Sequence, residues 1–583
     1  MKRWVIVLAA ILLMALTGMT AEPVKPTGDP RAIKGGQITI STTEFPKSFN
    51  LYVSNSADAA LVFGYIYESF AELDPKTKEY QPLLAESWSI SLDKKVFTFK
   101  MNPKARWADG TPVTTDDVKF TYDTLMNPKN MTSVYRMDLS RFYPPKVINK
   151  MTVQFTAKTV HYNNFVALAT LIILPRKAFA GKDFNTAFTM NLPPGTGPYY
   201  LSDVKEGRYY CLTRRKDYWG QNLPLHIGAY NFDRIRFKVY SNDDTAFEAF
   251  KKGDFDLFSE NQPKRWIKGT DSVKFKKNWI VKRKIYTYAP EGIRGMVFNM
   301  RRPIFKDLRV RQALFCLFNR KDILDKIMFD EFTPLRSYWP STNVNPTANP
   351  AVKFNPAHAK RLLYEAGYTR TDPKGFLINK KGEHMEFTVY YVSDVYEKYL
   401  TVYKQDCENA GVKMNLQMLS WASLLKHADE YKFDALIIGW TASIFPDPEQ
   451  LWHSKHATEV GGSNLAGYKS LEVDRMIDSL HANFDANQRD EVIKKIDAII
   501  YHDTPYVLFW GDNFNWIYYR NIFGMPKTVF SRLGGTSDAL TYWWIDRNMV
   551  KRLEKAERHN QALPKTPVDV YYDNELKTAI TGK

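Results

Sequence analysis

The sequence predicts an α/β protein that is divided into more than one lobe. A strand, a turn and a helix follow one another over residues 96–126, and residues 433–440 form an apolar run typical of a buried strand. The chain has 583 residues, of which 44% are hydrophobic and 14% aromatic. Because single hydrophobic cores stop growing at about 250–300 residues, a chain of this length is expected to form several lobes.

The N-terminus is predicted to be a targeting segment. Residues 1–3 are positively charged at two positions, residues 4–16 are apolar, and residues 17–21 include small side chains. The apolar run is shorter than the about 20 residues that a membrane-spanning helix needs. We therefore expect a signal peptide over residues 1–21, cleaved between residues 18 and 21, with a retained membrane anchor as the alternative. No cysteine follows the apolar run, so we expect a free periplasmic protein without a lipid anchor.

Charge and cysteine content exclude some classes of partner and site. The net charge is +18, but the 81 basic residues are mixed along the chain with 63 acidic ones. Together with export, this distribution argues against nucleic acid as a partner. Cys211, Cys316 and Cys407 are too few for a disulfide framework, and their spacing suits no zinc site. A single disulfide among them is left open.

The strand–turn–helix unit illustrates how local residues determine local structure. Residues 96–101 alternate between apolar and polar, and Asp109-Gly110 supplies a turn. Thr114 is placed to cap the following helix, with Asp117 three residues later in a capping-box arrangement. The apolar residues of that helix fall on one face, namely Val118, Tyr122 and Leu125.

Several blocks of sequence, taken in order, carry a family resemblance. They are PLLAESW at 82–88, RWADGTPVTTDDVKFTYDTLM at 106–126, PGTGPYY at 194–200, RRKDYW at 214–219, GDFDL at 253–257 and FKDLRVRQA at 305–313. Together they resemble the family 5 extracellular solute-binding proteins, which are the dipeptide-, oligopeptide- and nickel-binding receptors of ABC importers. The resemblance covers nearly the whole mature chain.

The resemblance implies the fold of a two-lobed periplasmic binding protein (class II, flytrap) with an additional smaller subdomain. Ligand is then enclosed in the cleft by hinge closure. The expected divisions follow the family's order along the chain. They are the signal peptide (1–21), lobe I (22–58, 191–292 and 509–583, the last with a peripheral C-terminal tail), subdomain II (59–190) and lobe III (293–508).

The resemblance also points to ligand-binding residues. Trp421 and Trp440 match positions where a family Trp lines the cleft and packs on ligand, although a core Trp at a strand end is the alternative for each. Asn464 and Tyr468 are further candidates.

One position departs from the family pattern. The di- and oligopeptide receptors have an Asp three residues after the second Trp, where it holds the α-ammonium group of the ligand, but this chain has Ser443. A hydroxyl cannot replace a carboxylate facing a buried ammonium. Asp447 is close in sequence but matches a separate Asp-Pro pair, so we expect the α-amino anchor to be absent, with a re-aimed Asp447 as the alternative. The expected ligand is a longer or N-blocked peptide, and an anionic one suits the basic chain.

No block of sequence predicts catalysis. His453, His456 and Glu459 have metal-ligand atoms but lack the H-E-x-x-H spacing, and the S-x-x-K at 423–426 lacks its companion motifs. We therefore expect a binding protein and no enzyme, with no metal and no cofactor.

The resemblance implies the substrate-binding component of an ABC importer. It would capture an oligopeptide in the periplasm as a monomer and deliver it to the permease and ATP-binding complex. Nickel, haem or an oligosaccharide are alternative ligands. A receptor outside transport, an envelope chaperone and a secreted hydrolase are the alternatives of other classes.

Overall fold

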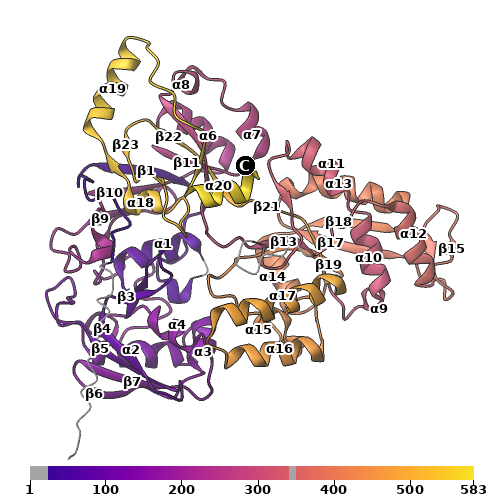
Figure 1. The fold of residues 1–583 in the computed structure, drawn as a ribbon, viewed down its shortest axis with the longest axis horizontal. Helices are drawn as coiled ribbons and strands as arrows, with labels where there is room; N and C mark the ends of the chain where they lie inside the picture. The colour runs from indigo at the N-terminus through magenta and orange to yellow at the C-terminus, as the bar shows by residue number, and fades with distance from the viewer. Residues whose placement is uncertain (1–23, 55, 341–348, 583) are drawn as a thin grey trace, which may run out of the picture.

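The computed structural model describes residues 24–54, 56–340 and 349–582, so the predicted signal peptide lies outside the described residues. The three largest sheets organise the described chain, each with helices packed on it (Figure 1). We call the bodies around them lobe I, subdomain II and lobe III.

Lobe I is built on an eight-stranded mixed sheet that three distant parts of the chain assemble. Its strand order is β25-β12-β22-β11-β1-β10-β9-β8. The strands are β1 (Gln37–Thr42), β8 (Tyr199–Lys205), β9 (Tyr209–Arg214), β10 (Arg234–Val239), β11 (Leu257–Glu260), β12 (Ile280–Tyr286), β22 (Phe514–Arg520) and β25 (Asp569–Tyr571). The helices of this lobe include α6 (Asp243–Lys252), α7 (Pro263–Lys268), α8 (Val273–Lys276), α18 (Asp538–Tyr542) and α19 (Arg547–Arg558).

Subdomain II contains a four-stranded antiparallel sheet in the order β4-β5-β7-β6. Its elements are α1 (Ala57–Ile66), β4 (Ala85–Ile90), β5 (Val96–Met101), α2 (Thr115–Met126), α3 (Ser133–Leu139), β6 (Lys146–Asn149), β7 (Thr152–Thr156) and α4 (Asn164–Ala169). The predicted strand over 96–101 and the predicted helix are confirmed. Asp117 accepts the amide hydrogen of Thr114 at 3.0 Å and the indole hydrogen of Trp107 at 3.3 Å. This carboxylate therefore fixes the turn as well as the helix start.

Lobe III contains a five-stranded sheet in the order β18-β17-β19-β13-β20. Its strands are β13 (Ile293–Phe298), β17 (Glu386–Tyr391), β18 (Lys413–Met418), β19 (Ala435–Trp440) and β20 (Tyr506–Leu508). The main helices are α10 (Leu308–Cys316), α12 (Pro356–Glu365), α13 (Asp394–Asn409), α14 (Trp421–Asp429), α15 (Glu449–Trp452), α16 (Leu471–His481) and α17 (Ala486–Asp503). Both β18 and β19 run parallel to β17, whereas β13 runs antiparallel to β19.

Glu68 and two of the family-like sequence blocks meet at one buried junction between subdomain II and lobe I. Glu68, just after α1, accepts hydrogen bonds from the hydroxyl of Tyr218 and from the indole nitrogen of Trp219, the latter at 3.0 Å. Its backbone amide donates to the hydroxyl of Thr196, within the Gly-Thr-Gly-Pro block, at 3.2 Å. The side chain of Tyr218 also lies 3.1 Å from Nδ1 of His226. These blocks therefore hold two bodies together.

The C-terminal segment joins the edge of the lobe I sheet. Strand β25 pairs in parallel with β12, and Tyr571 stacks on Tyr286 with ring centroids 4.7 Å apart. Helix α20 (Asn574–Thr581) follows, and its N-cap residue Asp573 accepts a hydrogen bond from the hydroxyl of Tyr288 at 3.0 Å. Figure 1 shows α20 on the side of lobe I that faces lobe III.

The three cysteines carry free thiols, so none of them forms the disulfide that the sequence left open. Within the described residues, no helix combines the length and the apolar character needed to cross a bilayer.

Candidate functional site

The candidate site lies at one edge of the lobe III sheet. Because β17, β18 and β19 are parallel, their carboxyl ends meet at the same edge, where open α/β sheets bind ligands. Strand β19 ends at Trp440, and Trp421 follows β18 by three residues. Strand β17 lies between these two, so the carboxyl ends of β18 and β19 are separated by two strand spacings, about 10 Å.

The two chain crossings between lobe I and lobe III pass beside this edge. One runs from the end of β12 to Ile293 at the start of β13, and the other from β20 to β22. Gly292 lies on the first crossing, where a Cβ atom would stand only 2.0 Å from the carbonyl oxygen of Trp440. The absence of a side chain at this position lets the crossing segment lie directly against the end of β19.

Two cavities flank the loop that leaves β19. The smaller has a volume of about 100 Å³, and the larger has about 220 Å³. The lining of the smaller cavity is mainly aromatic and apolar, from Gly292, Ile293, Tyr338, Trp339, Trp440, Thr441, Ala442, Ser443, Pro446, Asp447, Leu451 and Trp452. Pro446 lines both cavities, so the loop over residues 441–447 forms their common wall.

All three bodies contribute to the larger cavity. Its basic side chains are Lys78 from subdomain II, Arg532 from lobe I and Arg489 from lobe III. Asp490 and Glu575 supply acidic groups, so the C-terminal helix α20 also reaches this cavity. Burial, together with the charge of Arg532, lowers the pKa of Lys78. A negatively charged ligand group would relieve this repulsion between neighbouring cations.

Trp440 is held in place at the cavity wall. Its indole nitrogen donates a hydrogen bond of 3.0 Å to the hydroxyl of Tyr506 in β20. The ring is half-buried and lines the smaller cavity. Such a fixed aromatic surface binds ligand at a low entropic cost.

Ser443 and Asp447 also line the smaller cavity, but their polar atoms have protein partners. The hydroxyl of Ser443 accepts the amide hydrogen of Phe445 at 3.1 Å. One carboxylate oxygen of Asp447 accepts the amide hydrogen of Glu449 at 3.0 Å, and the other lies 3.4 Å from the side-chain nitrogen of Asn163. Burial raises the pKa of Asp447. Ser443 carries no carboxylate, and both carboxylate oxygens of Asp447 face protein donors in this conformation.

The other three candidates lie elsewhere. Trp421 is 55% exposed and does not line either cavity. Asn464 and Tyr468 are both buried and bond to each other: the amide hydrogen of Tyr468 donates to the Asn464 side chain at 2.9 Å. The Tyr468 hydroxyl donates to Asp503 at 2.7 Å. These contacts give Asn464 and Tyr468 a structural role in lobe III.

Sequence reasoning did not find the cations of the larger cavity. Lys78, Arg489 and Arg532 lie in three different bodies and belong to no common motif. Only the three-dimensional arrangement brings them together. Of the side chains that offered metal ligands in the sequence, His456 pairs with Glu459 at 2.5 Å and lies 3.4 Å from Glu449, whereas His453 lies 3.6 Å from Asp474.

Comparison with known proteins agrees with this architecture. Residues 79–462 match the family described as bacterial extracellular solute-binding proteins, family 5. YepA of Agrobacterium fabrum (strain C58 / ATCC 33970), named a peptidoglycan-binding protein, is 26% identical over 508 residues, which cover 78% of this chain and 82% of YepA.

Two solved structures share the fold. The oligopeptide-binding protein AppA of Bacillus subtilis, in complex with a nonapeptide, matches with a TM-score of 0.73 at 21% identity, covering 89% of this chain and 100% of AppA. DppA of Helicobacter pylori, an ABC transporter-associated periplasmic binding protein in complex with the peptide STSA, has a TM-score of 0.73 at 19% identity, covering 88% and 99%. The two-lobed fold with its extra subdomain and the sequence match over most of the chain lead to one assignment. The chain belongs to the family 5 bacterial extracellular solute-binding proteins, which bind solutes and are not enzymes.

Proposed function

We propose that the protein is the substrate-binding component of an ABC importer that captures an oligopeptide in the periplasm. The monomer is exported through a cleaved signal peptide and delivers its ligand to the permease and ATP-binding complex of the inner membrane. The observation that carries this proposal is the pair of cavities at the lobe crossings, with Trp440 fixed in the lining of the smaller one. AppA and DppA, which share the fold, hold peptides.

The polar groups of the site favour a peptide that is not held by a free N-terminus. Ser443 stands where the family's peptide receptors have the ammonium-binding Asp, and both oxygens of Asp447 face protein groups. The larger cavity adds Lys78, Arg489 and Arg532, which complement carboxylates along the ligand. The ligand class is therefore a longer or N-blocked, anionic oligopeptide.

Truncation of the fixed aromatic residue tests the proposed site. We expect Trp440→Ala to weaken the binding of an acidic pentapeptide by about 1–3 kcal/mol, because the variant loses a buried contact surface. Isothermal titration calorimetry measures the affinity, and thermal melting reports stability. Trp421→Ala is the companion variant, and weakened binding there would extend the proposed site across β17. An unchanged affinity in Trp440→Ala with a lower melting temperature would instead assign Trp440 to the core and remove it from the site.

A further inference from the structure

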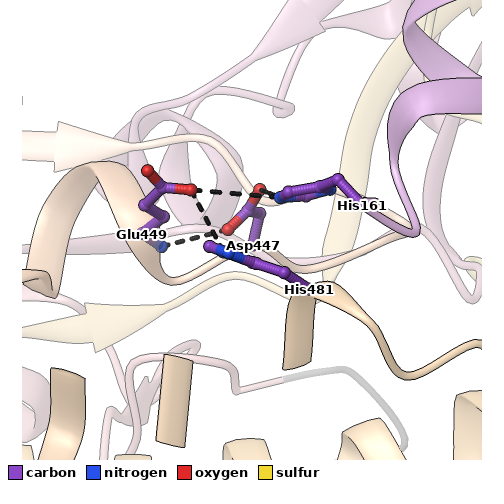
Figure 2. A group of neighbouring side chains, drawn as sticks. All are labelled: His161, Asp447, Glu449 and His481. Atoms are coloured by element: carbon purple, nitrogen blue, oxygen red, sulfur yellow. Dashed lines mark hydrogen bonds and ion pairs between the residues drawn. The ribbon is translucent and has the colours of Figure 1, made fainter. Parts of the chain in front are cut away.

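A cluster of four metal-ligating side chains lies where subdomain II meets lobe III (Figure 2). His161 comes from the loop before α4, Asp447 and Glu449 from the loop and first residue at α15, and His481 from the last residue of α16. One donor atom from each side chain lies within 4.8 Å of all the others. The four residues are up to 320 positions apart in sequence, so only the fold brings them together.

The distances between the donor atoms suit one small cation. His161 Nε2 lies 3.5 Å from Asp447 Oδ2 and 3.9 Å from Glu449 Oε2, and His481 Nε2 lies 3.1 Å from Glu449 Oε2. A tetrahedral zinc site with bonds of about 2.0–2.1 Å places its ligand atoms about 3.4 Å apart. These three separations bracket this value, and the remaining pairs of donor atoms lie within 4.8 Å.

Two nitrogen atoms in the cluster are buried without a hydrogen-bond partner among the described residues. The side chain of His161 is 5% exposed, and its Nε2 atom finds no hydrogen-bond partner among the described residues. The same holds for His481 Nε2, whose contact with Glu449 is an ion-pair distance without hydrogen-bond geometry. Buried polar atoms are nearly always satisfied, so two converging imidazole nitrogens indicate a missing ligand.

Neighbouring groups leave one oxygen of each carboxylate directed into the cluster. Lys455 pairs with Oε1 of Glu449, and His456 lies 3.4 Å from the same atom, which leaves Oε2 for the cluster. Oδ1 of Asp447 accepts the Glu449 amide hydrogen, which leaves Oδ2, whose other contact is the Asn163 side-chain nitrogen at 3.4 Å. Each carboxylate can thus serve as a one-atom ligand.

His161 must change its tautomer to bind a cation. Its Nδ1 accepts the amide hydrogen of Asn163 at 3.0 Å, which places the ring proton on Nε2. Coordination through Nε2 moves this proton to Nδ1 and gives up the Asn163 hydrogen bond. His481 has no such hydrogen bond to lose among the described residues, so the two histidines make independent test positions.

We propose that His161, Asp447, Glu449 and His481 bind a transition-metal dication of the zinc class that links subdomain II to lobe III. Two imidazoles and two carboxylates suit such a cation, whereas Ca²⁺ and Mg²⁺ prefer sites made of oxygen atoms. The loop carrying His161 already contacts lobe III, since the Tyr162 amide donates to the His481 carbonyl oxygen at 2.9 Å. Asp447 also lines the smaller cavity, so the cation braces one wall of the proposed site.

The test titrates Zn²⁺ and Co²⁺ into untagged, chelator-treated mature protein. We expect one Zn²⁺ per chain by calorimetry, and the intense visible absorption of four-coordinate Co²⁺ on addition of cobalt. His161→Gln and His481→Gln are each expected to lower Zn²⁺ affinity at least tenfold and to remove the cobalt bands. His384→Gln is the matched control, because His384 also pairs with a carboxylate, Asp372 at 3.1 Å, but lies outside the cluster.

The cobalt spectrum of the unmodified protein keeps the test valid if a variant fails to fold. Absence of stoichiometric Zn²⁺ binding, or octahedral cobalt bands alone, would overturn the proposal. So would equal affinities in the unmodified protein and in folded His161→Gln and His481→Gln variants, since the metal would then bind elsewhere. The metal titrations use no peptide, so their outcome does not depend on the proposed peptide binding. Peptide affinity is measured separately in the same variants.

Discussion

Replacing Gly195 with alanine is expected to destabilise the fold by about 3–5 kcal/mol, at the upper end of single-residue effects. A Cβ atom at this position would stand 2.0 Å from the carbonyl oxygen of Ile66 and 2.5 Å from the ring of Tyr67. Neither neighbour can move freely, because Ile66 O accepts the Gly197 amide hydrogen at 2.8 Å and the Tyr67 hydroxyl donates to Pro193 O at 2.5 Å. The added methyl group must therefore displace backbone at the junction of lobe I and subdomain II.

Urea denaturation of the unmodified protein and of Gly195→Ala measures the loss in the free energy of unfolding. Gly64→Ala is the matched control, because Gly64 lies in the adjacent helix α1 and an added Cβ there meets nothing within 4 Å. Since alanine is the better helix former, that substitution is expected to stabilise by about 0.5–1 kcal/mol. Similar small effects in both variants would show that the Gly-Thr-Gly-Pro block does not hold the junction.

The stability of the protein is expected to fall by about 3 kcal/mol between pH 4.5 and pH 7 through Glu68 alone. Burial raises the pKa of Glu68 from 4.5 to about 7, although Tyr218, His226 and Trp219 oppose this shift. Between these two values the unfolded chain has lost the proton that the folded chain retains. The contribution of Glu68 is therefore fully present below pH 4.5 and is lost as the pH rises through about 7.

A neighbouring titratable group, His226, acts in the same direction. Burial lowers the pKa of His226, but the carboxylate of Glu72, 3.0 Å away, outweighs this and the net pKa is raised. Its contribution to stability is also lost as the pH rises. Denaturation midpoints at pH 5 and pH 8 should therefore differ less in Glu68→Gln than in the unmodified protein, whereas the exposed-site control Glu79→Gln should keep the full difference. Equal pH dependence in Glu68→Gln and the unmodified protein would contradict the buried, proton-retaining Glu68.

Local patterns predicted the elements of the fold well. The alternation over 96–101 and the capping residues Thr114 and Asp117 define β5 and α2, and the apolar run before Trp440 defines β19. Each of these depends on residues within a few positions of one another, so periodicity and capping suffice to find them. The blocks of family-like sequence then placed these elements in the correct two-lobed fold.

Contacts between residues far apart in the sequence could not be predicted from local patterns. No local pattern indicates that the Gly-Thr-Gly-Pro block, Glu68 and Tyr218 form one junction, because they are separated by up to 150 residues. The cations of the larger cavity and the His161 cluster likewise come from separate bodies. For Asn464 and Tyr468, a polar turn within a core and a ligand contact use the same residue types, and only burial distinguishes them.

Closure of the lobes around a peptide is tested most directly by small-angle X-ray scattering of the ligand-free mature protein. The measurement is repeated with acidic tri- to pentapeptides, once with free and once with acetylated N-termini. The melting temperature of each sample is also measured. Both peptide sets are expected to decrease the radius of gyration and raise the melting temperature, because ligand binds the closed form and the N-terminus is not the anchor. An unchanged radius and melting temperature with both sets would contradict the proposed peptide receptor.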